Sequence, residues 1–181
     1  MKRNLRTFYL ITITQVLSLI GSRMTGLAIG IRASEWALAE MGKSGDEELV
    51  AVVETDMCGV DAVQYLTGCT FGKGNLRFHD YGKQIYTVYS RVSRKGVRVL
   101  FHGNGIPEKL REDRDALADW ILAAPADSIV SVSPVSIQEP EPARIMKSIP
   151  CAFCGESVMV SRIREIDGQT CCIPCYKQNA G

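Results

Sequence analysis

Seven cysteines are the residues of this chain whose type and spacing most clearly predict chemistry. Four of them form two pairs with two intervening residues each, Cys151–Cys154 and Cys172–Cys175. Each pair brings two thiolates to one ion, and two pairs complete the tetrahedral shell that zinc prefers. The spacing therefore predicts a structural zinc ribbon. Cys171 is a spare sulfur that is able to take the place of Cys172 as a ligand.

Other occupants of the four-cysteine site also follow from its soft sulfur donors. Four thiols suit iron or an iron–sulfur cluster, or a redox-active set without metal. An odd cysteine count with paired spacing favours metal binding in a reducing compartment, so we expect a cytoplasmic protein without a disulfide framework. A closed four-thiolate shell has no open coordination position, and we expect no catalysis there.

Net charge and the apolar segment near the N-terminus give no reason to expect a nucleic acid or a membrane as a partner. A formal net charge of +1 gives no reason to expect a nucleic acid. The basic first residues precede an apolar stretch over 7–20 that is too short to span a membrane and is followed by no small-residue cleavage site. One alternative stays open, in which the ribbon docks nucleic acid or protein through its basic residues. These are Lys147, Arg162, Arg164 and Lys177.

A second group of reactive residues lies between positions 54 and 75. Cys58 and Cys69 are candidate thiolate nucleophiles, with Asp61 as a polar neighbour and Lys73 as a charge partner that would lower a thiol pKa. A free cysteine is by default a small core residue, so the grouping supports a site more than either sulfur does.

A glycine-rich segment after Cys69 is a candidate ligand-binding loop. Its members are Thr70, Gly72, Lys73, Gly74 and Asn75. The glycines permit a tight turn with exposed N–H groups, and a lysine between them suits an anion. The segment departs from a P-loop, because its glycine spacing is one residue short and Gly74 stands where Ser or Thr must hold magnesium. The two histidines, His79 and His102, would join a metal here if the fold brought them close.

Apolar periodicity predicts the elements that position these residues. In chain order we expect a helix over 27–41 that closes at Gly42, a strand Leu49–Glu54, a helix Val60–Leu66 that ends at Gly68, strands Leu76–Phe78, Gln84–Ser90 and Val97–Phe101, a helix from Pro107 to Pro125, and a strand Ile129–Val132. The strands on either side of the turn at residues 94–96 are expected to form a hairpin.

Three regions follow from this pattern. Residues 1–135 are expected to form an α+β core, 136–149 a proline-rich linker, and 150–181 the zinc ribbon. The linker lies within a stretch that contains Pro134, Pro140, Pro142 and Pro150. In the ribbon we expect 157–162 and 164–166 to form a hairpin, with Asp167-Gly168 as a turn signal.

Several of these motifs resemble those of the FmdE family, named for the E protein of molybdenum formylmethanofuran dehydrogenase. The resemblance rests on Cys58-Gly-Val-Asp-Ala-Val-Gln, on Gly68-Cys-Thr-Phe-Gly-Lys-Gly-Asn-Leu, on Asp80-Tyr-Gly-Lys83 and on the paired cysteines of the tail, and it covers 26–176. It implies a thioredoxin-like α+β core with a mixed sheet flanked by helices, an appended zinc finger and a frequent homodimer. It names a context, the enzyme that starts methane formation from carbon dioxide, more than a reaction.

One departure from the family pattern concerns its core site. The family carries a His-Gly-His-x-Cys-Pro-Gly segment before the helix that begins at Gly26, whereas this chain has Leu19-Ile-Gly-Ser-Arg-Met-Thr25. Serine and arginine do not replace neutral imidazole as ligands of a soft metal. Either the chain is a degenerate member, or it binds something else through Cys58, Cys69 and Lys73, or residues 1–25 come from a misread frame.

The sequence therefore carries three functional hypotheses. The first is an FmdE-like metal-binding accessory protein, with formylmethanofuran dehydrogenase subunits as partners, zinc in its tail and a degenerate core site. The second is an enzyme of unknown reaction that uses Cys58 or Cys69 as a thiolate with Lys73. The third is the docking ribbon described above.

Overall fold

The computed structural model describes residues 24–41, 49–137, 141 and 145–179. The chain divides into two compact units, Met1–Pro142 and Ala143–Gly181. Three expectations lie outside the described residues: the leader-like segment over 7–20, the replaced histidine motif up to position 23, and the helix end at Gly42.

A five-stranded mixed sheet is the centre of the first unit. Its strands are β1 (Leu49–Val53), β2 (Leu76–Phe78), β3 (Ile85–Ser90), β4 (Gly96–Phe101) and β5 (Val130–Val135). They lie in the order β2-β1-β3-β4-β5, with β2 parallel to β1 and every other pair antiparallel. The expected α+β class and the hairpin of β3 and β4 are confirmed.

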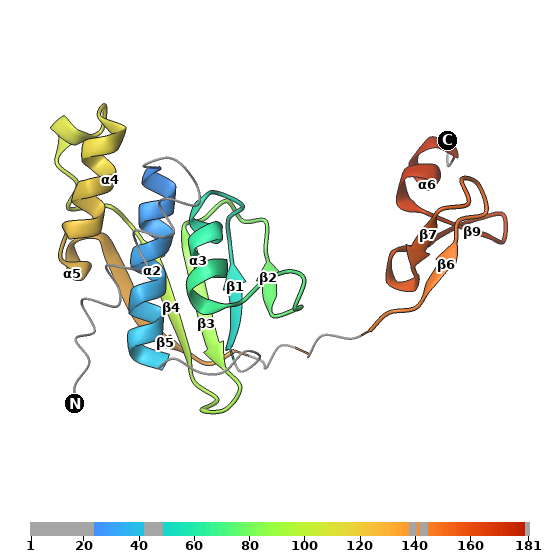
Figure 1. Cartoon of the computed structure of the whole chain (residues 1–181), viewed down its shortest axis with the longest axis horizontal. Helices are drawn as coiled ribbons and strands as arrows, with labels where there is room; N and C mark the ends of the chain where they lie inside the picture. The colour runs from blue at the N-terminus through green and yellow to red at the C-terminus, as the bar shows by residue number, and fades with distance from the viewer. Residues whose placement is uncertain (1–23, 42–48, 138–140, 142–144, 180–181) are drawn as a thin grey trace. The chain divides into compact units, whose positions relative to one another are not determined.

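Helices cover one face of this sheet (Figure 1). The long helix α2 (Thr25–Met41) packs over β3 and β4, and α3 (Gly59–Thr67) packs beside it over β1. Leu27, Ile31 and Leu38 form the buried stripe that periodicity predicts for α2. The left-handed Gly68 ends α3, with its N–H bonded to the Gln64 carbonyl.

Side chains that alternate along the strands form the core under these helices. Val53 faces Tyr86, which faces Val99, and the three lie on the helix-covered side in register across β1, β3 and β4. All three are at most 1% exposed. The aromatic Tyr86 is thus part of the core, although it carries a polar hydroxyl.

The region 107–125 differs from the expected single helix. A short 3-10 turn, η1 (Glu108–Leu110), is followed by a separate helix α4 (Arg114–Ala123). The break arises because Asp113 adopts an extended conformation and its carboxylate accepts the N–H of Ala116, which starts a new helix. Pro107 precedes the 3-10 turn in an extended conformation and does not begin a helix.

The last strand of the sheet is longer than expected. A short helix α5 (Ala126–Ile129), which sequence patterns did not predict, leads into β5, and β5 continues to Val135. Pro134 therefore lies in a strand and not in the linker. It is tolerated because β5 is an edge strand, where a missing N–H leaves no ladder bond unpaired.

The second unit contains two small hairpins and a helix. Strands β6 (Ser148–Pro150) and β7 (Ser157–Met159) pair with each other, as do β8 (Arg164–Ile166) and β9 (Gln169–Cys171). A 3-10 turn, η2 (Val160–Arg162), joins the hairpins, and α6 (Ile173–Asn179) follows the second. The expected pairing of 157–162 with 164–166 is wrong: Val160–Arg162 form η2, β7 pairs with β6, and β8 pairs with β9. The turn at Asp167-Gly168 is present, with positive φ at both residues.

Within the described residues, no helix has the length and apolar character that crossing a membrane requires.

Candidate metal centre and core constellation

Four cysteine sulfurs lie together at one end of the second unit. The sulfurs of Cys151, Cys154, Cys172 and Cys175 are all within 4.8 Å of one another. The separation of Cys154 and Cys172 Sγ is 3.9 Å. Zinc–sulfur bonds of about 2.3 Å place the corners of a tetrahedron about 3.8 Å apart, so the set fits one such ion.

The hairpins and the last helix bring these sulfurs together. Cys151 follows β6 and begins a turn that closes at Gly155. The N–H of Gly155 donates to the Cys151 carbonyl, and the φ angle of Gly155 is 77°. Cys172 follows β9, and Cys175 lies in the first turn of α6. Each pair thus follows a strand, the first in a tight turn and the second at the start of a helix, and both arrangements bring two close residues to one point.

Backbone N–H groups stabilise negative charge on these sulfurs. The N–H of Cys172 donates to Cys151 Sγ at 3.3 Å, and that of Cys175 donates to Cys172 Sγ at 3.4 Å. Hydrogen bonds from the backbone of Cys154 and then of Cys172 lower the pKa of the Cys151 thiol to about 6. A hydrogen bond to Cys172 raises the pKa of Cys175. The Cys151 thiolate therefore forms readily. A cation is needed to stabilise all four thiolates at once.

The fifth cysteine of the tail has a different environment. Cys171 is fully buried, and its sulfur donates to the Arg164 carbonyl at 3.6 Å. Burial raises the pKa of this thiol. It packs in a small cluster with Val158 and Ile166, as a core residue does. The four sulfurs that meet are those expected from the paired spacing, and Cys171 is not among them.

In the first unit, a close crossing of α2 and α3 positions Cys58. A Cβ added at Gly30 would collide with the backbone of Gly59, so the two glycines let the helix backbones touch. Cys58 precedes α3 and packs against Gly26. A Cβ added at Gly26 would lie 3.4 Å from the Cβ of Cys58. The half-buried thiol is therefore held at the start of α3, while Asp61 is exposed in the first turn of that helix.

Two residues near Cys58 were missed by sequence reasoning. The hydroxyl of Tyr86 lies against Gly59 and donates to Gln84 Oε1 at 2.6 Å. Burial, and then the charge of Cys58, raises the pKa of the Tyr86 phenol. No local signal identifies this neighbourhood, because β3 begins 27 residues beyond Cys58 and the contact depends on the sheet register.

Cys69 has the environment of a structural residue. It is 0% exposed, and its sulfur donates to the Leu49 carbonyl at 3.4 Å. Burial raises the pKa of this thiol, and Lys73 opposes the shift as the smallest of its causes. A buried thiol with a raised pKa is a poor nucleophile, so this geometry does not support a thiolate role for Cys69.

The glycine-rich segment uses its own polar groups to fix its turn. Asn75 is buried, accepts the N–H of Thr70 through Oδ1 at 2.9 Å and donates to the Leu49 carbonyl at 3.1 Å. The Thr70 hydroxyl accepts the N–H of Lys73, and Gly74 has φ at 72°. Gly72 and Lys73 are exposed at the tip. The side chains of Thr70 and Asn75 thus already have partners inside the loop.

The histidines do not join either cysteine of the first unit. His79 lies beside Tyr81, with ring centroids 5.4 Å apart, and His102 accepts the N–H of Asn104. Across the part of the chain that the structure describes, the four tail cysteines form the one group of three or more His, Cys, Asp or Glu side chains close enough to share an ion.

Comparisons with known proteins identify a family for most of the first unit. Residues 21–131 match the family described as "FmdE, Molybdenum formylmethanofuran dehydrogenase operon". A crystal structure of a tungsten formylmethanofuran dehydrogenase FmdE-like protein from Syntrophus aciditrophicus is similar over 96% of this chain and 94% of that one, with a TM-score of 0.71 and 25% identity.

A curated relative covers the same region in a longer protein. A probable S-adenosyl-L-methionine-binding protein from Archaeoglobus fulgidus is 29% identical over 169 residues, which covers 77% of this chain. The chain spans 46% of the length of that relative. The printed name describes the whole relative, and more than half of that protein lies outside the match.

Proposed function

The chain belongs to the FmdE family, and from this premise we propose that it is a zinc-binding accessory protein of a formylmethanofuran dehydrogenase system. Zinc is bound by Cys151, Cys154, Cys172 and Cys175. The observation that carries the proposal is the convergence of these four sulfurs within 4.8 Å. The link to the dehydrogenase and to C1 metabolism rests on the family name.

The size of the second unit supports a structural role for the ion. Domains below about 40 residues rarely bury enough apolar surface to fold without a staple. Here the buried cluster consists of Cys151, Cys171 and Cys172, with Val158 and Ile166 packed against it. Since the cysteines make up most of that cluster, binding free energy of the metal is also folding free energy of the unit.

Metal analysis of variants tests the ligand assignment. The purified chain should hold about one zinc ion, and Cys154→Ser should release it, because three thiolates leave the tetrahedron open. Cys69→Ser is the matched control: it makes the same sulfur-to-oxygen change at a buried position whose hydrogen bond to the Leu49 carbonyl a serine can keep. Zinc loss from Cys69→Ser, or full zinc in Cys154→Ser, would refute the assignment. Iron with visible thiolate absorption would keep the ligands and replace the ion.

Co-purification tests the partner separately. A tagged chain, expressed together with the dehydrogenase subunits, should retain them on the affinity resin. An unrelated four-cysteine ribbon carrying the same tag is the control. Retention that is equal for both proteins would contradict the proposed association and leave the zinc assignment untouched.

A further inference from the structure

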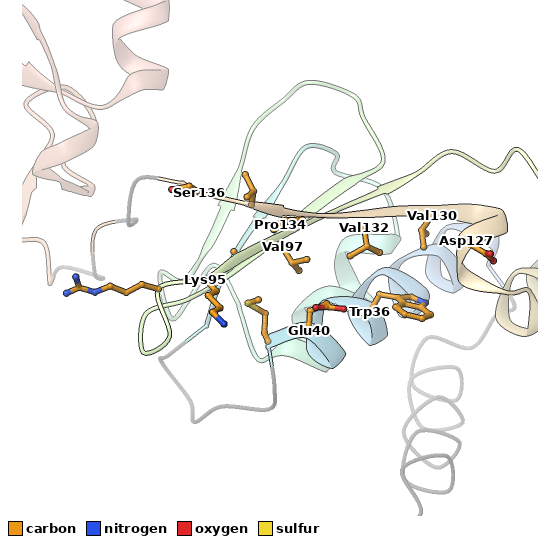
Figure 2. A pocket seen from close by; sticks show the side chains of 13 residues that line it. Trp36, Glu40, Lys95, Val97, Asp127, Val130, Val132, Pro134 and Ser136 are labelled. Atoms are coloured by element: carbon orange, nitrogen blue, oxygen red, sulfur yellow. The ribbon is translucent and has the colours of Figure 1, made fainter.

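A large cavity opens on the helix-covered face of the sheet, and no cysteine lines it. Its volume is about 960 Å³, and α2, β4 and β5 line it. Figure 2 shows Val97, Val130 and Val132 along its floor. These residues share one face because Val130 and Val132 alternate along β5 and Val97 pairs with Pro134. The floor is therefore a continuous apolar strip.

The last two turns of α2 form the wall opposite this floor. Trp36 and Glu40 project from them into the cavity (Figure 2), and Met41 also lines it. Because Trp36 and Glu40 are four residues apart, they lie on the same side of the helix. The wall thus combines an aromatic ring and a thioether with one carboxylate at its edge.

Polar groups of different kinds lie at the two ends of the cavity. Asp127 lies near the Trp36 ring at one end, and Lys95 and Ser136 lie at the other (Figure 2). The indole Nε1 of Trp36 is buried, and nothing in the described residues accepts its hydrogen bond. A buried donor without an acceptor is unfavourable, and a ligand oxygen would supply the missing acceptor.

Backbone conformation adds a second observation at the cationic end. Arg94, which also lines the cavity, has φ at 55°. The left-handed region is unfavourable for a residue with a side chain, whereas glycine adopts it readily. The hairpin nevertheless carries arginine there, next to Lys95, so two cationic residues line this end of the cavity.

From this arrangement we propose that the cavity binds an elongated organic carboxylate with an apolar body and a hydrogen-bonding oxygen at its far end. The carboxylate lies by Lys95 and Arg94, the apolar body on the valine floor, and the far oxygen by the Trp36 N–H. The volume lies within the range of about 300–1,000 Å³ that is typical of small-molecule sites. A floor of valines offers ordered water no partners, whereas it suits a hydrocarbon chain.

The test uses a matched pair of probes and the fluorescence of Trp36. Trp120, the other tryptophan, does not line the cavity, so Trp120→Phe leaves Trp36 as the sole reporter. In that background, 8-hydroxyoctanoate should shift the Trp36 emission in a saturable titration. The diol 1,8-octanediol has the same length and far end but no carboxylate, and it should bind about tenfold more weakly or worse.

Two variants locate the site. Arg94→Gln with Lys95→Gln should weaken 8-hydroxyoctanoate binding about tenfold and leave diol binding unchanged, while Lys109→Gln, an exposed lysine outside the cavity, should change neither. Val132→Phe should abolish both by filling the floor, with thermal melting to show that the variant is folded. Non-saturable titration, equal affinity for acid and diol, or no effect of the Arg94 and Lys95 pair would each overturn the proposal.

Discussion

The crossing of α2 and α3 at Gly30 and Gly59 permits a quantitative test of how Cys58 is positioned. In Gly30→Ala, the added Cβ would lie 2.6 Å from both the carbonyl carbon and the Cα of Gly59. Ordinary carbon contacts begin near about 3.5 Å, so α3 must move away by about 1 Å. Because the obstacle is backbone and not the end of a flexible side chain, no rotamer change can relieve it.

The expected cost follows from two opposing effects. Overpacking of this kind costs about 3 kcal/mol, the upper end of the usual range, since the backbone itself must move. Replacing glycine by alanine inside a helix contributes about 1 kcal/mol of stability. The free energy of unfolding should therefore fall by about 2 kcal/mol, even though alanine is the better helix former.

Urea unfolding followed by tryptophan fluorescence measures this loss in the first unit alone, because both tryptophans, Trp36 and Trp120, lie there. With a denaturant slope of about 2 kcal/mol per molar urea, the midpoint should fall by about 1 M. Gly72→Ala is the control, since an added Cβ there has nothing within 4 Å. A Gly30→Ala midpoint equal to or above that of the unsubstituted chain would refute the close crossing.

Three further outcomes follow from the described contacts. Asp113→Ala should lower the free energy of unfolding by about 1 kcal/mol, because the carboxylate that accepts the Ala116 N–H at the start of α4 is lost. Urea unfolding measures this loss, with Asp113→Asn as the conservative variant. Asn75→Ala should cost about 2 kcal/mol by the same measurement, since it leaves the Thr70 N–H and the Leu49 carbonyl without this partner. Metal should be released as the pH falls, because the ligand form of each cysteine is the thiolate and protons compete with the ion for it. Dialysis with metal analysis at stepped pH checks the direction.

Helices and strands with a regular spacing of apolar residues could be predicted from the sequence. Elements whose ends depend on a side-chain hydrogen bond to the backbone could not. The stripe of α2 and the runs of β1 and β3 were predicted almost to the residue, because burial on one face imposes a period that the sequence must follow. The break in the 107–125 region was not predicted. An apolar stripe does not reveal that the Asp113 side chain accepts the N–H of Ala116 and so starts a new helix. Likewise, turn chemistry located Asp167-Gly168 but did not determine which strands pair across it.

The candidate sites divide in the same way. Cysteine spacing predicted the four tail sulfurs, because two cysteines separated by two residues can reach one ion within a single short segment. The hairpins only bring the two segments together. The neighbourhood of Cys58 and the cavity of Trp36 and Lys95 both depend on the register of distant strands. Neither leaves a pattern within one segment, so sequence reasoning grouped Cys58 with its neighbours in the chain instead of with Tyr86.

The surroundings of Cys58 bear on whether the first unit offers ligands for a soft metal. Among the described residues, the polar groups shown near Cys58 are the Tyr86 phenol and, bonded to that phenol, the Gln84 amide. Burial keeps the phenol protonated at neutral pH, and an amide is a hard neutral oxygen donor, so neither matches a soft ion as imidazole or thiolate would. The tail offers four thiols to one point. We therefore predict that substitution of Cys58 by serine changes neither the amount of bound zinc nor its release by acid, and metal analysis of the variant measures both.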